Sequence, residues 1–332
     1  MSRSTEEQKA FDNLMSQQEQ IEAPCDASQF RIFRRMAENE SNFFAIGFGG
    51  GSVPGLAANT ALMGLIDELK LRPFVKEVWG TSAGSIVAGA MACGLTSREM
   101  LPLLQELDRP GVVDIPRWQV LGKGLLRFLF RQKVPDGFVR GEHFRRALIQ
   151  AQPVRTFEET QIPLRMIACT DDGNARKVVL RSGPLVEAGM ASMCIPGVMM
   201  PVQDWNGQSH GYLDGGVVEK TPLVSIIEDH CRLDRSQDLL AVTTHFSPRK
   251  RRPEGFVQRF VSTIDHMEEV SWEHQRAQAR ETPNCKPIIL NPQLEFGGMF
   301  DFSYVQFNYL WARRSFKQQL SNAGLATRFD AR

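Results

Sequence analysis

The chain has 332 residues, 42% of them hydrophobic, which is enough for one large α/β domain or two smaller ones with ordinary cores. Its 39 basic and 38 acidic residues give a net charge of +1, so no global positive field favours nucleic acid, and we predict no nucleic-acid partner. The sequence contains no run of about 18 apolar residues, the length that a helix needs to span a bilayer. The polar N-terminus lacks the apolar segment of a secretory signal. We therefore expect a cytoplasmic protein that is soluble or, at most, bound to a membrane surface.

The six cysteines form no Cys-x-x-Cys pair, and several lie in apolar or small-residue segments. This is typical of buried, reduced thiols and not of a disulfide framework or a zinc site. The histidines likewise show no metal-binding spacing such as His-Glu-x-x-His. We predict neither a metal ion nor a cofactor. The cysteines are Cys25, Cys93, Cys169, Cys194, Cys231 and Cys285.

Residues 1–40 form a polar, mainly helical lead in which the apolar residues Phe11, Leu14 and Ile21 are sparse. This pattern favours an appended arm over a part of the core. No composition shift or linker marks a second boundary further along the chain. We therefore predict an N-terminal arm over residues 1–40 and a single domain over residues 41–332.

Two strand-turn-helix units follow the arm. The run Phe43–Phe48 has the length and composition of a buried strand, and it ends in Gly49–Gly51 before a small, apolar helix over Gly55–Leu69. A second strand, Phe74–Gly80, leads into Ser82 and a helix so rich in alanine and glycine that it must pack closely. Consecutive units of this kind predict an α/β fold with a mainly parallel central sheet flanked by helices. Further strands are expected at Ile162–Thr170, Lys177–Leu180, Asp238–Phe246 and Lys286–Asn291.

Ser82 lies in the sequence Gly80-Thr81-Ser82-Ala83-Gly84, with a glycine two residues away on each side. Glycines at these positions allow a strand to turn sharply into a helix, which presents the serine hydroxyl at the helix N-terminus. The N–H groups and dipole of that helix favour an oxyanion, so Ser82 is a candidate nucleophile. The alternative is an ordinary strand-to-helix turn, because short Gly-x-Ser-x-Gly sequences occur by chance.

The glycine loop before the first of these helices carries no nucleotide-binding motif. The sequence GFGGGSVPG lacks the third glycine of Gly-x-Gly-x-x-Gly and has no Walker Gly-Lys-Ser/Thr. The N–H groups of Gly49, Gly50 and Gly51 can instead donate to the oxyanion of a tetrahedral intermediate formed at Ser82. A tight turn without a ligand is the alternative.

Asp214 follows the short apolar pair Tyr212-Leu213 and precedes Gly215 and Gly216. A carboxylate at a strand end, with open space behind it, suits a base beside a nucleophile. An Asp-Gly hairpin turn is the alternative.

Together these motifs resemble the patatin-like phospholipase family over roughly residues 43–320. The resemblance implies that Gly49, Gly50 and Gly51 form the oxyanion hole, that Ser82 in its Gly-x-Ser-x-Gly elbow is the nucleophile, and that Asp214 in its Asp-Gly-Gly motif is the base. The order and spacing of the three motifs agree with the family.

Two further features carry the resemblance. The sequence Ala191–Gly197, continued to Pro201, is similar to the family's Ala-Ser…Ile-Pro-Gly…Pro block, and Pro222 stands where members tend to have proline. The resemblance implies a three-layer fold and a hydrolase of the phospholipase, lysophospholipase or carboxylester hydrolase type, with a lipid or phospholipid substrate. In such a hydrolase, the resemblance implies, a Ser82/Asp214 dyad forms an acyl-enzyme that water then hydrolyses. A lone carboxylate needs a pKa raised by burial, or a very short hydrogen bond to the serine, to act near neutral pH.

The chain departs from the family pattern at two places. Its loop over Gly49–Gly55 is one residue longer than Gly-Gly-Gly-x-Arg/Lys-Gly and lacks the basic side chain, and Glu219 and Lys220 stand where asparagine is common. A catalytically silent patatin fold with a regulatory or interaction function therefore remains an alternative. So does a lipid acyltransferase, because nothing in the sequence distinguishes water from another acyl acceptor.

A Ser-His-Asp triad is a weaker alternative, since His210 lies four residues before Asp214 and the direction of its side chain is open. We expect the remaining histidines to be structural or exposed. They are His143, His230, His245, His266 and His274.

Three segments bear on membrane contact. Val120–Arg131 interleaves bulky apolar and basic residues. One interpretation is a segment that caps the site and touches a phospholipid surface. The alternative is an ordinary amphipathic helix. The aromatic run Phe300–Leu320 predicts a packing helix. The basic Arg249–Pro253 predicts a solvated loop, with an anion or membrane contact as the alternative.

Overall fold

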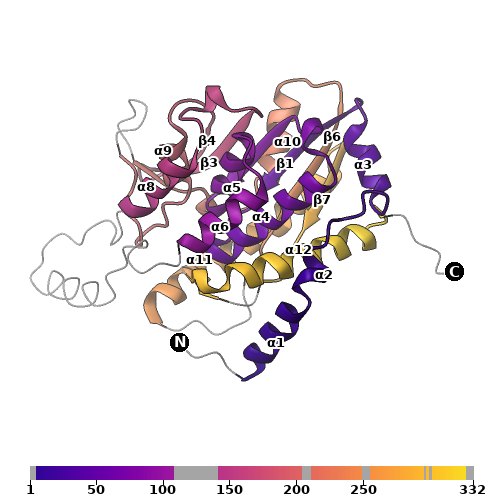
Figure 1. Ribbon diagram of the computed structural model, residues 1–332. Helices are drawn as coiled ribbons and strands as arrows, with labels where there is room; N and C mark the ends of the chain where they lie inside the picture. Colours follow the sequence, from indigo (N-terminus) through magenta and orange to yellow (C-terminus); the bar gives the residue numbers. More distant parts are fainter. Residues whose placement is uncertain are drawn as a thin grey trace, which may run out of the picture.

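The computed structural model describes residues 5–107, 141–203, 211–248, 255–294, 297–298 and 301–326. Its centre is a sheet with the strand order β4-β3-β2-β1-β6-β7, in which β5 also pairs with β3 (Figure 1). Neighbouring strands from β3 to β7 in this order are parallel, whereas β4 and β5 run antiparallel to β3. The strands are β1 Asn42–Phe48, β2 Glu77–Thr81, β3 Leu164–Asp171, β4 Lys177–Leu180, β5 Gly211–Asp214, β6 Asp238–Thr244 and β7 Cys285–Leu290.

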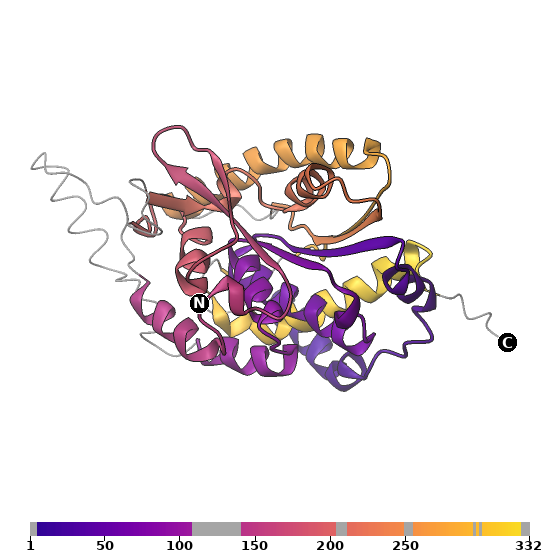
Figure 2. The same cartoon turned by 90° about the horizontal axis from the view of Figure 1, so that it is seen from above.

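Helices cover both faces of the sheet and produce three layers (Figure 2). α4, α5, α6 and α12 lie on one side, and α10 and α11 lie on the other. This architecture confirms the predicted α/β fold with a mainly parallel central sheet. The helices are α1 Thr5–Ser16, α2 Gln18–Glu22, α3 Arg31–Glu38, α4 Ser52–Glu68, α5 Ala83–Ala92, α6 Ser97–Glu106, α8 Glu142–Ala151, α9 Leu185–Ser192, α10 Leu223–Arg232, α11 Gly255–Glu281 and α12 Val305–Asn322, with 3₁₀ turns η1 Arg72–Phe74, η2 Phe157–Glu159, η3 Gly215–Val217 and η4 Phe302–Tyr304.

The two helices that follow the first strands are almost entirely buried. Every residue of α5 is buried, and so is every residue of α4 from Val53 to Ile66, as their small side chains predict. β1 is buried along its whole length, which is expected for a strand covered on both faces. The strand predicted from Phe74 begins only at Glu77, because η1, with a proline in its first turn, precedes it.

The strand pairing brings two distant chain segments together at β3. β2 runs parallel to β3, and its last residue, Thr81, pairs with Ile167. β5 runs in the opposite direction, and its last residue, Asp214, pairs with the next residue of β3, Ala168. Since β4 occupies the other edge of β3, β2 and β5 share one edge and meet end to end. The turn after β2 therefore lies beside the end of β5.

The N-terminal segment contributes to the core. Leu14 on α1, Ile21 on α2 and Phe33 on α3 are buried in the same hydrophobic cluster as the inner residues of α4 and α12. The expectation that this polar lead lies outside the core is therefore wrong for these residues. Its apolar residues are spread over three short helices, so no single helix shows a continuous apolar stripe. The domain boundary after residue 40 stays a prediction.

The six cysteines are all free, but they differ in exposure. The prediction of buried thiols is wrong for Cys231, which is exposed, and for Cys285, which is half-buried. Cys231 lies in the last turn of α10, where the helix reaches the surface. The other four are buried, and burial raises the pKa of the Cys194 thiol to about 12, so it stays protonated.

Among the described helices, none has both the length and the apolar content to cross a bilayer. The predicted C-terminal packing helix is confirmed as α12, which buries Phe307, Leu310 and Phe316. Three segments with sequence predictions, Val120–Arg131, Arg249–Pro253 and the surroundings of His210, lie outside the described residues.

Candidate active site

Ser82 occupies a sharp turn between β2 and α5. Its backbone has φ 53° and ψ −128°, a left-handed conformation that is unfavourable for any residue with a side chain. The flanking glycines are required by close approach, since a Cβ added at Gly84 would lie 2.1 Å from the carbonyl oxygen of Phe48, and one at Gly80 would lie 2.5 Å from the Cα of Ser85. The predicted sharp turn from strand to helix is therefore present, with the serine at the N-terminus of α5.

Asp214 lies within hydrogen-bond distance of this serine. Ser82 Oγ donates to Asp214 Oδ2 over 2.7 Å, and the Gly216 N–H donates to Asp214 Oδ1, also over 2.7 Å. The hairpin alternative is wrong, because Asp214 ends β5 and caps the 3₁₀ turn η3, after which the chain continues to α10. Both oxygens of the carboxylate are thus oriented by the protein.

Burial raises the pKa of the Asp214 carboxyl from 3.8 to about 6. The hydrogen bonds from Ser82 and Gly216 oppose this shift, as does the positive charge of Lys220, whereas the charge of Asp265 adds to it. Desolvation prevails because the side chain is only 6% exposed. This is the kind of shift that a lone carboxylate base requires.

The glycine loop lies against Ser82, but its three N–H groups differ in their hydrogen bonds. A Cβ added at Gly50 would lie 3.1 Å from the Cβ of Ser82. The Gly49 N–H donates to Thr244 Oγ1 and the Gly50 N–H donates to the carbonyl oxygen of Lys220, each over 2.8 Å. Within the described part of the chain, the Gly51 N–H makes no hydrogen bond.

Ser192 contacts Ser82, and the sequence alone predicts no role for it. Its hydroxyl accepts from the Ser82 N–H over 2.9 Å and donates to the carbonyl oxygen of Ile167 over 2.6 Å. Two residues further on, the carbonyl oxygen of Cys194 accepts from the Asp214 N–H over 2.8 Å. The Ala191–Gly197 block therefore supports both members of the pair. The only sequence signal for this was its match to the family pattern.

Lys220 is a mostly buried cation close to the site, with its side chain 11% exposed. Its Nζ lies 2.7 Å from Asp265 Oδ1 and 3.5 Å from Glu268 Oε2, both on α11. Burial raises the pKa of Glu268 to about 8. The sequence alone shows Lys220 only as a departure from the family pattern, because its partners on α11 lie 45 residues or more away along the chain.

Two buried histidines, His230 and His245, have structural partners. His245 stacks on Trp272 with ring centroids 4.3 Å apart, and it bonds Thr221 Oγ1 and Glu269 Oε2. Burial lowers its pKa to about 3, so it is neutral. His230 Nε2 donates to the carbonyl oxygen of Gln237. No group of three histidine, cysteine or carboxylate side chains in the described ranges is arranged to bind a metal ion.

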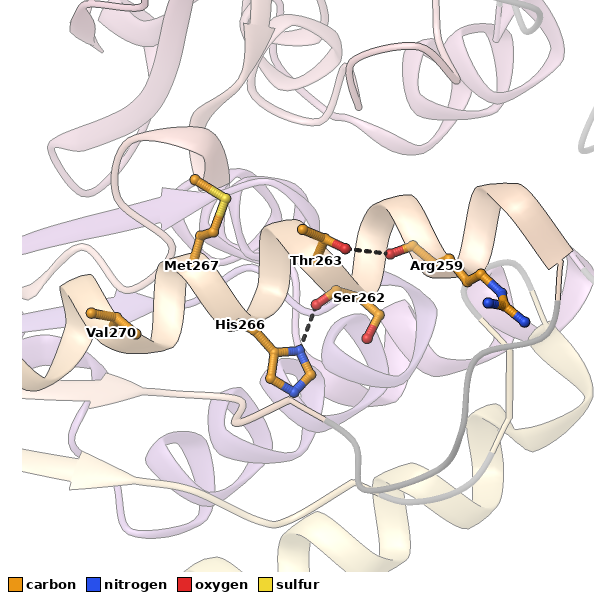
Figure 3. A pocket seen from close by; sticks show the side chains of 6 residues that line it. All are labelled: Arg259, Ser262, Thr263, His266, Met267 and Val270. Carbon is orange, nitrogen blue, oxygen red and sulfur yellow. Dashed lines mark hydrogen bonds between the residues drawn. The ribbon is translucent and has the colours of Figure 1, made fainter.

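Two depressions in the surface lie along α11. A shallow groove of about 610 Å³ is lined by six residues of this helix alone. Its polar side chains form hydrogen bonds within the helix, from Thr263 Oγ1 to the carbonyl oxygen of Arg259 and from His266 Nδ1 to that of Ser262 (Figure 3). It includes neither Ser82 nor Asp214. A smaller cleft of about 210 Å³ lies between α11 and residues 216–221, and Lys220 and Glu268 line it. The groove residues are Arg259, Ser262, Thr263, His266, Met267 and Val270.

Comparison with known proteins places this site in a family. A family model described as patatin-like phospholipase matches residues 48–227, a range that includes Ser82, Ser192 and Asp214. YqhO, an uncharacterized protein of Bacillus subtilis (strain 168), is 30% identical over 224 residues, which are 61% of this chain and 71% of YqhO.

Solved structures of larger proteins are similar at low identity. VipD from Legionella pneumophila has a TM-score of 0.44 and 12% identity, with 85% of this chain and 66% of VipD covered. The type III effector ExoU from Pseudomonas aeruginosa has a TM-score of 0.41 and 15% identity, with 85% of this chain and 53% of ExoU covered. The chain thus spans just under two thirds of VipD and about half of ExoU.

Proposed function

Because this chain belongs to the patatin-like phospholipase family, we propose that it is a serine hydrolase that cleaves acyl esters of lipids or phospholipids. The observation that carries the proposal is the 2.7 Å hydrogen bond from Ser82 Oγ to Asp214 Oδ2, made at a turn with an unfavourable backbone conformation. Backbone strain at a hydrogen-bonded serine is typical of a functional site.

Ser82 and Asp214 carry both halves of the reaction. Ser82 Oγ attacks the ester carbonyl carbon while its proton passes to Asp214 Oδ2 and the carbonyl electrons move onto the oxygen. The tetrahedral intermediate then expels the alcohol, which takes the proton from Asp214, and the acyl group stays on Ser82. Water attacks this acyl-enzyme in the same way, giving its proton to Asp214. The carboxylic acid leaves, and the proton returns to Ser82 Oγ.

Gly51 and the start of α5 are the proposed donors to the oxyanion. The Gly51 N–H has no hydrogen bond within the described residues. Ala83 is the first residue of α5, and N–H groups in the first turn of a helix have no intrahelical acceptor. The positive end of the helix dipole adds to their effect. Gly49 and Gly50 instead shape the loop, because their N–H groups already donate to the protein.

Covalent labelling with a fluorophosphonate probe tests the proposal, since such probes react with activated serines. We expect the wild type to be labelled and Ser82→Ala not to be. Asp214→Asn should react about 10²- to 10⁴-fold more slowly, because it lacks the general base. Ser321→Ala, at an exposed serine of α12, is the control and should label like the wild type. An unlabelled wild type, or equal labelling of Ser82→Ala, would refute the hydrolase and favour the silent alternative.

Product analysis then separates hydrolysis from acyl transfer and tests membrane contact. Phosphatidylcholine vesicles and a soluble p-nitrophenyl ester are supplied in turn, each with and without glycerol. Free fatty acid as the product in the presence of glycerol supports the hydrolase, whereas acylglycerol indicates a transferase. Turnover of the soluble ester without any turnover or binding of vesicles would contradict a phospholipid substrate and the expected contact with a membrane surface.

A further inference from the structure

A closed ring of three hydrogen bonds surrounds the peptide groups of Gly49. The Gly49 N–H donates to Thr244 Oγ1 over 2.8 Å, and the Thr244 hydroxyl donates to Asn59 Oδ1 over 2.6 Å. Asn59 Nδ2 completes the ring by donating to the Gly49 carbonyl oxygen over 2.9 Å. The two side chains therefore hold the N–H and the C=O of the same residue.

The ring has one consistent direction. A carbonyl oxygen only accepts and an N–H only donates, so the Thr244 hydroxyl must point to Asn59, and the Asn59 amide must turn its nitrogen to Gly49. Rotation of a Gly49 peptide group would break one or two of these bonds, and bulk solvent does not reach the partner side chains to replace them. Asn59 and Thr244 are both 0% exposed.

The position of the two polar side chains is informative. Asn59 lies on α4 among small apolar residues, and Thr244 is the last residue of β6, beside β1. Burying an amide and a hydroxyl costs free energy that an apolar pair would avoid, unless their hydrogen bonds serve the chain they contact. That chain is the loop next to Ser82. The loop also fits tightly here, because a Cβ added at Gly49 would lie 2.4 Å from the carbonyl oxygen of Thr244.

The fixed geometry extends toward Gly51. The next N–H, that of Gly50, donates to the carbonyl oxygen of Lys220, and the ring of Phe246 packs against Gly51, where an added Cβ would lie 2.6 Å from it. These contacts restrict the backbone conformation of the loop from Gly49 to Gly51. They do so although the loop lacks the basic residue of the family pattern.

We propose that Asn59 and Thr244 are positioning residues, which hold the Gly49 peptide groups so that the Gly51 N–H faces the substrate oxygen at Ser82. This inference rests on the proposed hydrolase function. It predicts that breaking the ring lowers the rate of the chemical step and leaves substrate binding almost unchanged, since the donor acts on the oxyanion.

Thr244→Val is the test, because valine has the same shape and lacks the hydroxyl. We expect kcat for a soluble ester to fall about 10- to 100-fold with KM within about threefold, since a small misalignment of a catalytic donor has effects of this size. Thr244→Ser keeps the hydroxyl and should restore kcat to within about threefold of the wild type. Thr243→Val is the matched control, as the neighbouring hydroxyl is buried without a partner in the described part of the chain, and its activity should be that of the wild type.

Asn59→Leu removes both the donor and the acceptor of the amide with little change in shape and provides a second variant. If both side chains act through one ring, the losses in Thr244→Val and in the double variant with Asn59→Leu should be similar and not multiply. A purely structural ring would lower the melting temperature but leave kcat within about twofold at a temperature where each variant is folded. That outcome, with a wild type that is labelled and active, would overturn the positioning role alone. An unlabelled wild type would instead overturn the proposed function.

Discussion

Asp214 combines a proposed catalytic role with a cost in stability to the folded state. Its carboxyl is almost completely buried, and its pKa of about 6 lies close to the pH at which a general base acts best. The same desolvation that makes the group more basic also disfavours its charged form in the folded protein. One shift therefore has two measurable consequences, one for activity and one for stability.

The first consequence is an acid limb in the pH dependence of kcat/KM. Only the ionised carboxyl of Asp214 accepts the proton of Ser82, so kcat/KM should rise about tenfold per pH unit below pH 6 and level off above it. An uncharged p-nitrophenyl ester is the appropriate substrate, because only the enzyme then titrates. Glu268→Gln is the control, since burial raises the pKa of Glu268 to about 8 and any limb there should vanish in this variant. A constant kcat/KM from pH 5 to pH 8 would exclude Asp214 as the base.

The second consequence is a gain in stability when Asp214 is neutralised. A raised pKa means that the folded state binds the proton more tightly than the unfolded state, so stability falls as the pH rises from 3.8 through 6. Asp214→Asn should therefore raise the free energy of unfolding at pH 7.5 by up to about 3 kcal/mol, and by little at pH 3.5. Urea denaturation at both pH values measures the difference.

Asp171→Asn is the control for this measurement. Asp171 lies on β3 and is exposed, so the substitution should change the free energy of unfolding by less than about 0.5 kcal/mol at either pH. If Asp214→Asn is less stable than the wild type at pH 7.5, the hydrogen bonds from Ser82 and Gly216 outweigh the desolvation of the carboxylate.

At the level of elements, the site depends on two strand ends that meet. β2 and β5 run in opposite directions along one edge of β3, and Thr81 and Asp214 pair with consecutive residues of it. A parallel strand at the same position would place its last residue, Asp214, opposite Asp171, at the end of β3 that lies away from β2. The antiparallel pairing of a four-residue strand is thus what places Asp214, the proposed base, beside Ser82.

Much of this arrangement was predictable from the sequence. Apolar runs followed by glycines located β1, β2 and the helices after them, because buried parallel strands are apolar throughout and tight turns need residues without a Cβ. The spacing of Gly80 and Gly84 indicated the elbow, and Asp-Gly-Gly indicated the base.

The rest depends on contacts that local patterns do not encode. Nothing near Gly49 or Gly50 in the sequence shows that Thr244 and Lys220 accept from their N–H groups, since these partners lie about 200 and 170 residues away. That Gly49, Gly50 and Gly51 form an oxyanion hole stays a prediction, to which the structure adds that the N–H groups of Gly49 and Gly50 already donate to the protein. Ser192 is similar, since its partner Ser82 is 110 residues away.

At the level of the whole molecule, Arg313 connects the C-terminal helix α12 to the N-terminal segment and to α4. It lies on α12 with its side chain 1% exposed. It donates to the carbonyl oxygens of Ile21 and Ala23 over 2.7 and 3.1 Å, and to Glu68 Oε2 on α4 over 2.7 Å. Figure 2 shows α12 lying along the layer that contains α4, whose N-terminus begins at the glycine loop.

This linkage predicts that Arg313 determines whether the N-terminal helices stay bound. Arg313→Met keeps the apolar stem but removes the guanidinium from Glu68 and from the two carbonyl groups. Glu68 then keeps only the Cys25 N–H as a donor, and the carbonyl groups keep only the longer contacts with Lys317 Nζ, so we expect a loss of about 3 kcal/mol in the free energy of unfolding. Hydrogen exchange should show α1 and α2 losing protection before the sheet, because the broken contacts lie between these helices and the core. Arg314→Met removes a neighbouring arginine that bonds the exposed side chain of Gln17, and it should cost less than about 0.5 kcal/mol. Equal stability of the two variants would mean that the apolar residues Leu14, Ile21 and Phe33 hold the segment by themselves.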